Sequence, residues 1–166
     1  MIVLGVDPGT TATGYGVIER PGLGPHRLIE CGVVRAPARA PLEQRLAAIF
    51  EALTDLIARH RPDAMAIEDV FVAKNVRSAL VLGHARGVIL LAAARAGVPV
   101  ATYPPAVIKK AVVGAGAATK EQVQRMITQL LRLKTAPSPS DAADGVAVAL
   151  THSLRAGRRF RRAVVG

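Results

Sequence analysis

Four acidic residues stand out by their type and position. Asp7 and Glu68 each end an apolar run, and Asp141 and Asp144 lie three residues apart in S-P-S-D-A-A-D-G. Carboxylates crowded into one site repel one another unless divalent cations neutralise them. The chain that carries them has a net charge of +10, which favours a polyanion as the partner. Together these features predict a metal-dependent nuclease.

The two acids of the D-A-A-D segment also have a structural interpretation to weigh. Ser138 could cap a helix that begins at Pro139, with Asp141 as its capping-box partner. The same explanation fails for Asp144, because an almost wholly apolar segment follows it, and a carboxylate there should face a positive group. We therefore favour a functional role for both acids, and more strongly for Asp144.

The acidic pair Glu68-Asp69 ends a short apolar run. Side chains alternate along a strand, so only one of the two can face Asp7. A strand-end acid that faces solvent is the structural alternative, and it suits Asp69 better. We expect Glu68 to face Asp7.

The other side chains limit the kind of metal site and the compartment. The chain has one cysteine, Cys31, in a strand-like run, and its four histidines are scattered. This pattern excludes an internal disulfide and a zinc site, so Cys31 should be a buried thiol and any metal should be bound by oxygen. The longest strongly apolar stretch, within 87–94, has eight residues, and no basic start precedes the first apolar run. We expect a soluble cytoplasmic protein with no membrane insertion.

The patterning along the chain predicts one α/β domain with helices on a five-stranded mixed sheet. Three strands form an antiparallel meander, and two later strands follow helices and should run parallel. The predicted strands are Ile2 to Val6, Gly14 to Glu19, Arg27 to Arg35, Ala64 to Ile67 and Val98 to Tyr103. The predicted helices are Pro41 to His60, Val76 to Ala96, Pro104 to Val112, Thr119 to Leu133 and Ser138 to Leu154. This topology places Asp7 and Glu68 at one sheet edge.

The predicted helix from Val76 to Ala96 is apolar on more than one side, which indicates two packing partners. Gly83 and Gly87 are four residues apart and would let another backbone approach closely. One partner could be the same helix of a second subunit. Burial within a single chain explains the pattern equally well.

Several residues near the acids suit contacts with nucleic acid. Phe71 follows the acidic pair in a predicted loop, where its ring could wedge between base pairs or pack beneath the loop. Lys109, Lys110 and Lys120 border a glycine-rich connection; they are either solvated surface lysines or phosphate contacts that offset the charge of the acids. His152 could shuttle protons, but a helix histidine with its own hydrogen-bond partner is the better interpretation.

Two other classes of protein compete with a nuclease. The turn after Asp7, D-P-G-T-T, is similar to the phosphate-binding hairpin of actin-like and sugar-kinase ATPases, which clamp a nucleotide between two domains. A chain of 166 residues supplies only one such domain. A non-catalytic DNA-binding architectural protein is the second competitor, but it has no reason to place acids against a phosphate backbone. A nuclease of the same fold that acts on RNA or another branched substrate is the nearest alternative.

The order of the elements and the four acids resemble the RuvC family, the Holliday junction resolvases of bacteria, which have the ribonuclease H-like fold. The resemblance spans nearly the whole chain. The matching segments are G-V-D-P-G at 5–9, A-I-E-D-V-F at 66–71, G-H-A-R-G-V at 83–88, V-V-G at 112–114 and D-A-A-D at 141–144.

This resemblance implies roles for particular residues and a reaction. The metal-binding catalytic acids would be Asp7, Glu68, Asp141 and Asp144. The contacts to DNA would come from Phe71, which stacks on junction bases, and from Lys109 and Lys120. The resemblance further implies two Mg²⁺ ions per subunit, with Mn²⁺ able to substitute. The products would be 5'-phosphate and 3'-hydroxyl ends.

The resemblance also implies partners and an organisation of the chain. A four-way junction has two-fold symmetry, so the enzyme should be a homodimer, with the helix from Val76 to Ala96 at the interface. The implied roles are homologous recombination and DNA repair in the cytoplasm, beside the RuvA and RuvB branch-migration helicase. Residues 1–154 would form the nuclease domain, and residues 155–166 a basic, flexible tail without a matching motif.

Overall fold

The computed structural model describes residues 1–22, 24–69 and 76–164, with side chains up to residue 157. A five-stranded sheet in the order β3-β2-β1-β4-β5 forms its centre. The strands are β1 (Ile2–Asp7), β2 (Ala12–Glu19), β3 (Arg27–Arg35), β4 (Ala64–Glu68) and β5 (Val100–Tyr103). β1, β2 and β3 pair antiparallel, whereas β4 runs parallel to both β1 and β5. The predicted mixed sheet, with its meander and its parallel strands, is confirmed.

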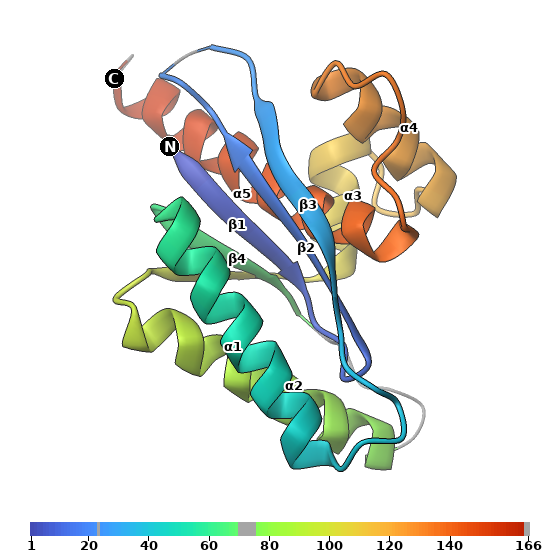
Figure 1. Ribbon diagram of the computed structural model, residues 1–166. Coiled ribbons are helices and arrows are strands. Elements are labelled where there is room, and N and C mark those ends of the chain that lie inside the picture. The colour runs from blue at the N-terminus through green and yellow to red at the C-terminus, as the bar shows by residue number, and fades with distance from the viewer. Residues whose placement is uncertain (23, 70–75, 165–166) are drawn as a thin grey trace.

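Helices cover both faces of this sheet, as Figure 1 shows. One face carries α1 (Leu42–His60) and α2 (Val76–Arg95), which pack against each other. The other face carries α5 (Ser140–Val164), with α3 (Pro105–Val113) and α4 (Lys120–Leu130) beside it. The side chains of the central strands alternate between two apolar cores, one under each helix layer. This three-layer arrangement fixes the ends of β1, β4 and α5 relative to one another.

The contact between α5 and the sheet is unusually close. A Cβ atom added to Gly14 of β2 would collide with the backbone carbonyl of Asp141, and one added to Gly16 would lie 2.6 Å from the Cα atom of Val146. Only glycine leaves this space, so α5 can lie with its backbone against β2. The first turns of α5 are thereby held beside the end of β1.

The ends of the helices α4 and α5 differ from the sequence predictions. α4 ends at Leu130 rather than Leu133, and its N-terminus is fixed by a capping box between Thr119 and Gln122. α5 begins at Ser140, which does not fit Ser138 as its cap, and it continues past Leu154 to Val164. The prediction that this helix ends at Leu154 is wrong, because the arginines and alanines that follow are good helix formers. A separate tail from residue 155 onward stays a prediction.

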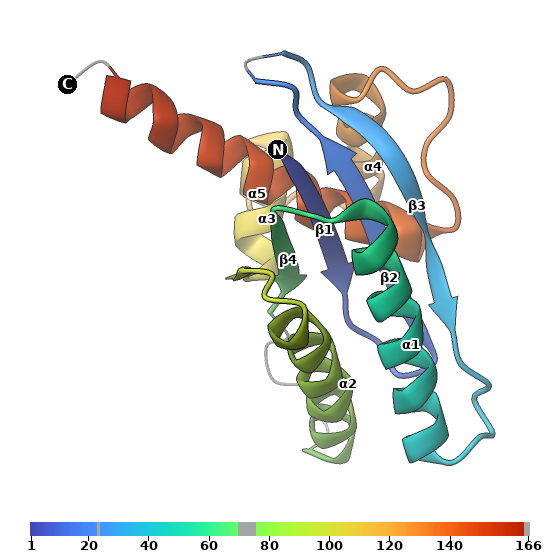
Figure 2. The ribbon, with the colours of Figure 1, turned by 60° about the vertical axis from the view of Figure 1, so that its left-hand side comes forward.

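The helix α2 has two unlike sides. Its residues Ala85, Ile89, Ala92 and Ala93 are buried in the core beneath it. Among the described residues, α2 is the one helix whose length and composition would allow it to cross a membrane. One such helix is weak evidence for a membrane span, since core helices of soluble proteins pass the same test of length and composition. Figure 2 shows α2 at the outside of the molecule, beside α1.

Candidate active site

Asp7 and Glu68 end two neighbouring strands. β1 and β4 are parallel, with Val6 paired to Ile67, so the residue that follows each of them lies at the same sheet edge. The carboxyl groups of Asp7 and Glu68 share a hydrogen bond. Glu68 therefore faces Asp7, as the alternation of side chains along a strand predicts.

The helix α5 brings the other two acids to this edge. Asp144 accepts a 2.7 Å hydrogen bond from Nζ of Lys120, which also donates to the hydroxyl of Ser140 at 3.1 Å. The expectation that Asp144 faces a positive group is met by this ion pair. Asp141 lies one turn earlier and is half-buried; its charge acts on Asp7. The four predicted acids thus surround one end of the sheet.

Three of these acids line a common cavity. The cavity has a volume of about 240 Å³, and its walls come from β1, β4, α3, α4 and α5. Its polar lining residues are Asp7, Glu68, Lys109, Lys120 and Asp144. Its apolar lining residues are Pro105, Ile108, Val123 and Ala147. Asp141 stands outside this lining, so the structure brings three acids and two predicted lysines together and places the fourth acid beside them.

Burial and crowding change the protonation of this site. Burial raises the pKa of Glu68 to about 8, and the charges of Asp7 and Asp144 add to that rise. The pKa of Asp7 rises to about 6, mainly through burial and then through the charge of Asp144, while Lys120 opposes the rise. The pKa of Glu68 is raised further than that of Asp7, so of the two acids Glu68 keeps its proton more readily and can donate it to Asp7. A cation that replaced this proton would relieve the repulsion among the acids.

The chemistry of these side chains fits a hard divalent cation. All the candidate ligands are carboxylates, and oxygen ligands are those that Mg²⁺ and Mn²⁺ prefer. As the side chains stand, no group of three or more His, Cys, Asp or Glu residues within the described part of the chain is arranged to hold a metal ion. The ammonium group of Lys120 instead neutralises Asp144. The site thus gathers side chains of the kind that such a cation prefers, and the ammonium group of Lys120 is the counter-charge of Asp144 in this structure.

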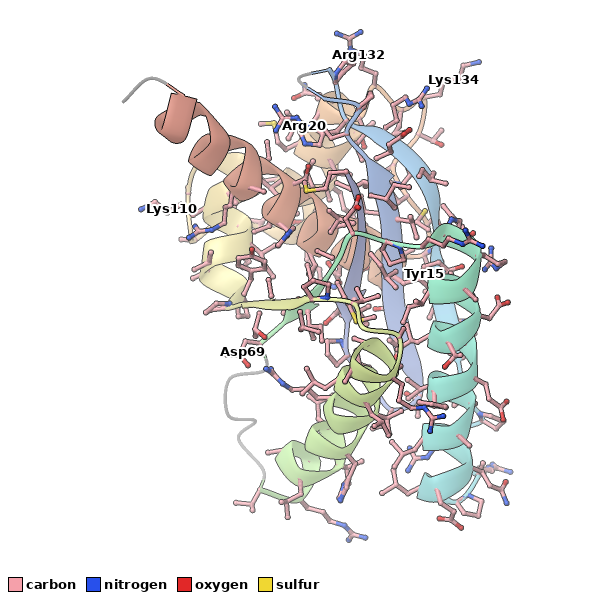
Figure 3. The ribbon with its side chains drawn as sticks, turned by 90° about the vertical axis from the view of Figure 1, so that its left-hand side faces the viewer. Tyr15, Arg20, Asp69, Lys110, Arg132 and Lys134 are labelled. Atoms are coloured by element: carbon pink, nitrogen blue, oxygen red, sulfur yellow. The ribbon has the colours of Figure 1, made fainter. Side chains whose placement is uncertain are left out.

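The remaining predicted residues lie elsewhere. Phe71 falls in 70–75, outside the described residues. Nδ1 of His152 is 2.9 Å from the hydroxyl of Tyr103, which agrees with a histidine that has its own partner, and His152 does not line the cavity. Cys31 is half-buried rather than buried. Lys110 projects outward from α3 at the left of Figure 3; it does not line the active-site cavity but lines a second pocket.

Sequence reasoning missed an ion pair that anchors the end of β4. Asp69, at the sheet edge in Figure 3, pairs with the guanidinium of Arg86 on α2. Its backbone N–H donates to the carbonyl oxygen of Tyr103 at 2.8 Å, which continues the pairing of β4 with β5. Glu68 and Asp69 therefore face different partners. The sequence shows Arg86 within the segment G-H-A-R-G-V, but no helical or strand spacing relates this arginine to Asp69. The ion pair could therefore not be predicted from the sequence.

Comparisons with known proteins give a consistent result. The family model described as crossover junction endodeoxyribonuclease RuvC matches residues 3–152. A relative of that name from Halorhodospira halophila is 48% identical over 164 residues, covering 99% of this chain and 96% of its own. The structure of Thermus thermophilus RuvC in complex with a Holliday junction substrate superposes with a TM-score of 0.89 at 40% identity, covering 94% of each chain.

A more distant likeness concerns the fold alone. The yeast mitochondrial Holliday junction resolvase has a TM-score of 0.62 at 13% identity, covering 98% of this chain and 85% of its own. The sheet and the helices on its two faces form a ribonuclease H-like fold. The chain belongs to the RuvC family of crossover junction endodeoxyribonucleases.

Proposed function

We propose that this protein is a structure-specific endonuclease that resolves four-way (Holliday) DNA junctions in homologous recombination and DNA repair. It makes two symmetric nicks that leave 5'-phosphate and 3'-hydroxyl ends. The observation that carries the proposal is the convergence of Asp7, Glu68 and Asp144 with two lysines in one cavity. Membership of the RuvC family and the likeness to a relative solved with junction DNA support the substrate.

The four acids would hold the metal. Asp7, Glu68, Asp141 and Asp144 would bind Mg²⁺, two ions per subunit, with Mn²⁺ able to substitute. When bound, the metal would activate the attacking water and stabilise the leaving 3' oxygen. Binding requires that Glu68 and Asp7 lose their protons, since a protonated carboxyl is a poor ligand. The raised pKa values of these two acids therefore mean that metal binding should strengthen as pH rises.

The lysines would offset the negative charge of the DNA. Lys109 lines the cavity, and Lys120 bonds Asp144 across it. A phosphodiester that enters a cavity of carboxylates meets repulsion, which nearby ammonium groups offset. Lys120 can exchange its bond to Asp144 for one to the phosphate. Phe71, which belongs to 70–75, would stack on the bases of the opened junction.

The apolar outer side of α2 supports a homodimer. Val76, Leu80, Leu91 and Leu90 have exposed fractions of 76%, 62%, 52% and 36%. A Cβ atom added to Gly83 or Gly87 would meet nothing within 4 Å. A contiguous apolar strip with room for close backbone approach is typical of a helix that packs on its own copy. A two-fold dimer would place two active sites on the two opposed strands of a junction.

The setting of this function follows from the family and the substrate. The protein would act on DNA in the cytoplasm, beside the RuvA and RuvB branch-migration helicase. The exposed apolar residues of α2 are explained by a dimer, so they do not require a membrane. Specificity would come from the shape and deformability of the four-way junction.

A cleavage assay tests the proposal. A labelled synthetic four-way junction and a linear duplex of the same sequence are incubated with Mg²⁺ or with EDTA, for the wild type and Asp144→Asn. We expect symmetric, metal-dependent nicking of the junction alone, lost in Asp144→Asn while binding persists. Tight binding without nicking under any metal would leave an architectural DNA-binding protein. Equal cutting of the duplex would indicate a general nuclease on the same fold.

A further inference from the structure

A second pocket lies on the other side of α3 from the active-site cavity. It has a volume of about 300 Å³. Val107, Lys110 and Ala111 of α3 line it, together with Leu154 and Arg155 of α5. Its charged lining residues are both basic, whereas the active-site cavity has three acids against two lysines. The two pockets therefore differ in the charge of the group that each would accept.

The helix α3 is the wall between the two pockets. Ile108 and Lys109 line the active-site cavity, whereas their neighbours Val107 and Lys110 line the second pocket. Successive residues of a helix are about 100° apart around its axis, so adjacent lysines can serve opposite sides. A DNA strand with one phosphate at Lys109 would cross α3 before another of its phosphates reached Lys110.

The arginine of this pocket is connected to the strand beside Glu68. The guanidinium carbon of Arg155 lies 5.8 Å from the ring centroid of Tyr103, and the hydroxyl of Tyr103 is 2.9 Å from Nδ1 of His152. Tyr103 pairs with Glu68 across β4 and β5. A cation–π contact of this kind restrains an arginine without consuming its hydrogen-bond donors. In the described part of the chain, neither Lys110 nor Arg155 forms a salt bridge.

We propose that this pocket binds a non-scissile phosphate of the DNA backbone, on the strand that is cut. The inference rests on the proposed function. Lys110 and Arg155 supply the charge and the donors, and the apolar lining residues would contact the sugar beside the phosphate. The phosphates of one strand in a duplex advance about 3.4 Å per nucleotide along the duplex axis, and a protein helix with side chains is about 10 Å wide. The bound phosphate should therefore lie about three nucleotides from the cut.

The function of such a contact would be positioning. A phosphate held at a fixed distance along the strand sets which bond enters the acidic cavity, without reading a base. Because Arg155 contacts Tyr103, which pairs with Glu68, the two sites share one rigid support. We expect loss of the contact to weaken junction binding and to spread cleavage over neighbouring bonds.

Salt-dependent binding of junction DNA in EDTA, where no cutting occurs, tests the charge contacts. Each lost phosphate contact lowers the magnitude of the slope of log K against log salt by about 0.9, so the double variant Lys110→Ala with Arg155→Ala, which removes one contact, should lower it by roughly 0.9. Lys134→Ala is the matched control, because Lys134 is exposed and lies on the opposite side of the molecule from Lys110 (Figure 3). Circular dichroism and thermal unfolding verify that the variants fold.

Single methylphosphonate substitutions then locate the phosphate. In the wild type, an uncharged linkage about three nucleotides from the cut should weaken binding; in the double variant, the same linkage should cause no further loss. Identical slopes and identical interference maps in the wild type and the double variant would overturn the phosphate site while leaving junction cleavage intact. A wild type that does not bind junctions would overturn both this inference and the proposed function.

Discussion

The two helix layers of this protein pack against the sheet in different ways. α5 presses its backbone onto β2 through Gly14 and Gly16, and its segment from Val146 to Leu150 is buried throughout. α2 buries one side and leaves large apolar residues such as Leu80 and Leu91 exposed on the other. The tightly packed layer carries two of the acids, and the open layer carries the surface that we propose for a second copy. In this proposal, the rigid part of the chain is separate from the part that would meet a partner.

Glycine-to-alanine substitutions in the two layers would test this difference most strongly. Gly16→Ala should lower the free energy of unfolding by about 2 to 4 kcal/mol, because the added methyl group meets the backbone of Val146. Gly87→Ala should leave the fold of a single chain unchanged or stabilise it by up to about 1 kcal/mol, since nothing lies within 4 Å of the added atom. Urea denaturation at low protein concentration measures both. Equal losses in the two variants would contradict the comparison.

Charges placed on the open layer should separate the subunits without unfolding them. Leu80 and Leu91 are 62% and 52% exposed, so Leu80→Glu with Leu91→Glu costs little within one chain but would bury two charges per subunit in a dimer. We expect the dimer to become a monomer in sedimentation experiments while circular dichroism is unchanged. Leu130→Glu is the control, because Leu130 is 37% exposed on α4. A variant that stays dimeric would place the interface elsewhere.

The acidic site should make stability depend on pH in the absence of metal. Glu68 and Asp7 have folded-state pKa values of about 8 and about 6. In the folded state they keep protons that the unfolded chain has lost, so their contribution is greatest at low pH and disappears as pH rises through about 8. We expect the melting temperature in EDTA to fall between pH 5 and pH 9, and Mg²⁺ to reduce that fall.

A matched pair of variants tests whether Glu68 causes this pH dependence of the melting temperature. Glu68→Gln should flatten the slope of melting temperature against pH. Glu51→Gln should not, because Glu51 is exposed on α1. A slope that persists in Glu68→Gln would show that other groups cause it.

The sequence predicts the sheet and the placement of the acids because both depend on local patterns. Asp7 and Glu68 each follow an apolar run, and strands that return from a helix run parallel, so the shared edge follows from topology. Asp144 breaks the apolar surface of its helix, which indicates a polar neighbour. Such signals need no knowledge of distant contacts.

Two of the features that the sequence did not predict depend on contacts between distant segments, and a third depends on local composition. The ion pair of Asp69 and Arg86 joins a strand end to a helix with no periodic relation between them. The glycines of β2 are weak strand formers by themselves, and their purpose appears only when α5 lies across them. The helical continuation past Leu154 was missed because an arginine-rich segment has the composition of a solvated tail.

The most direct test of the metal-dependent site compares two adjacent carboxylates. Glu68 lines the cavity, whereas its neighbour Asp69 pairs with Arg86. Single-turnover cleavage of a labelled four-way junction in Mg²⁺ should be about a thousandfold slower for Glu68→Gln, and within about tenfold of wild type for Asp69→Asn, with junction binding retained in both. Comparable rates for the wild type and Glu68→Gln would contradict the claim that these carboxylates form the metal-dependent site.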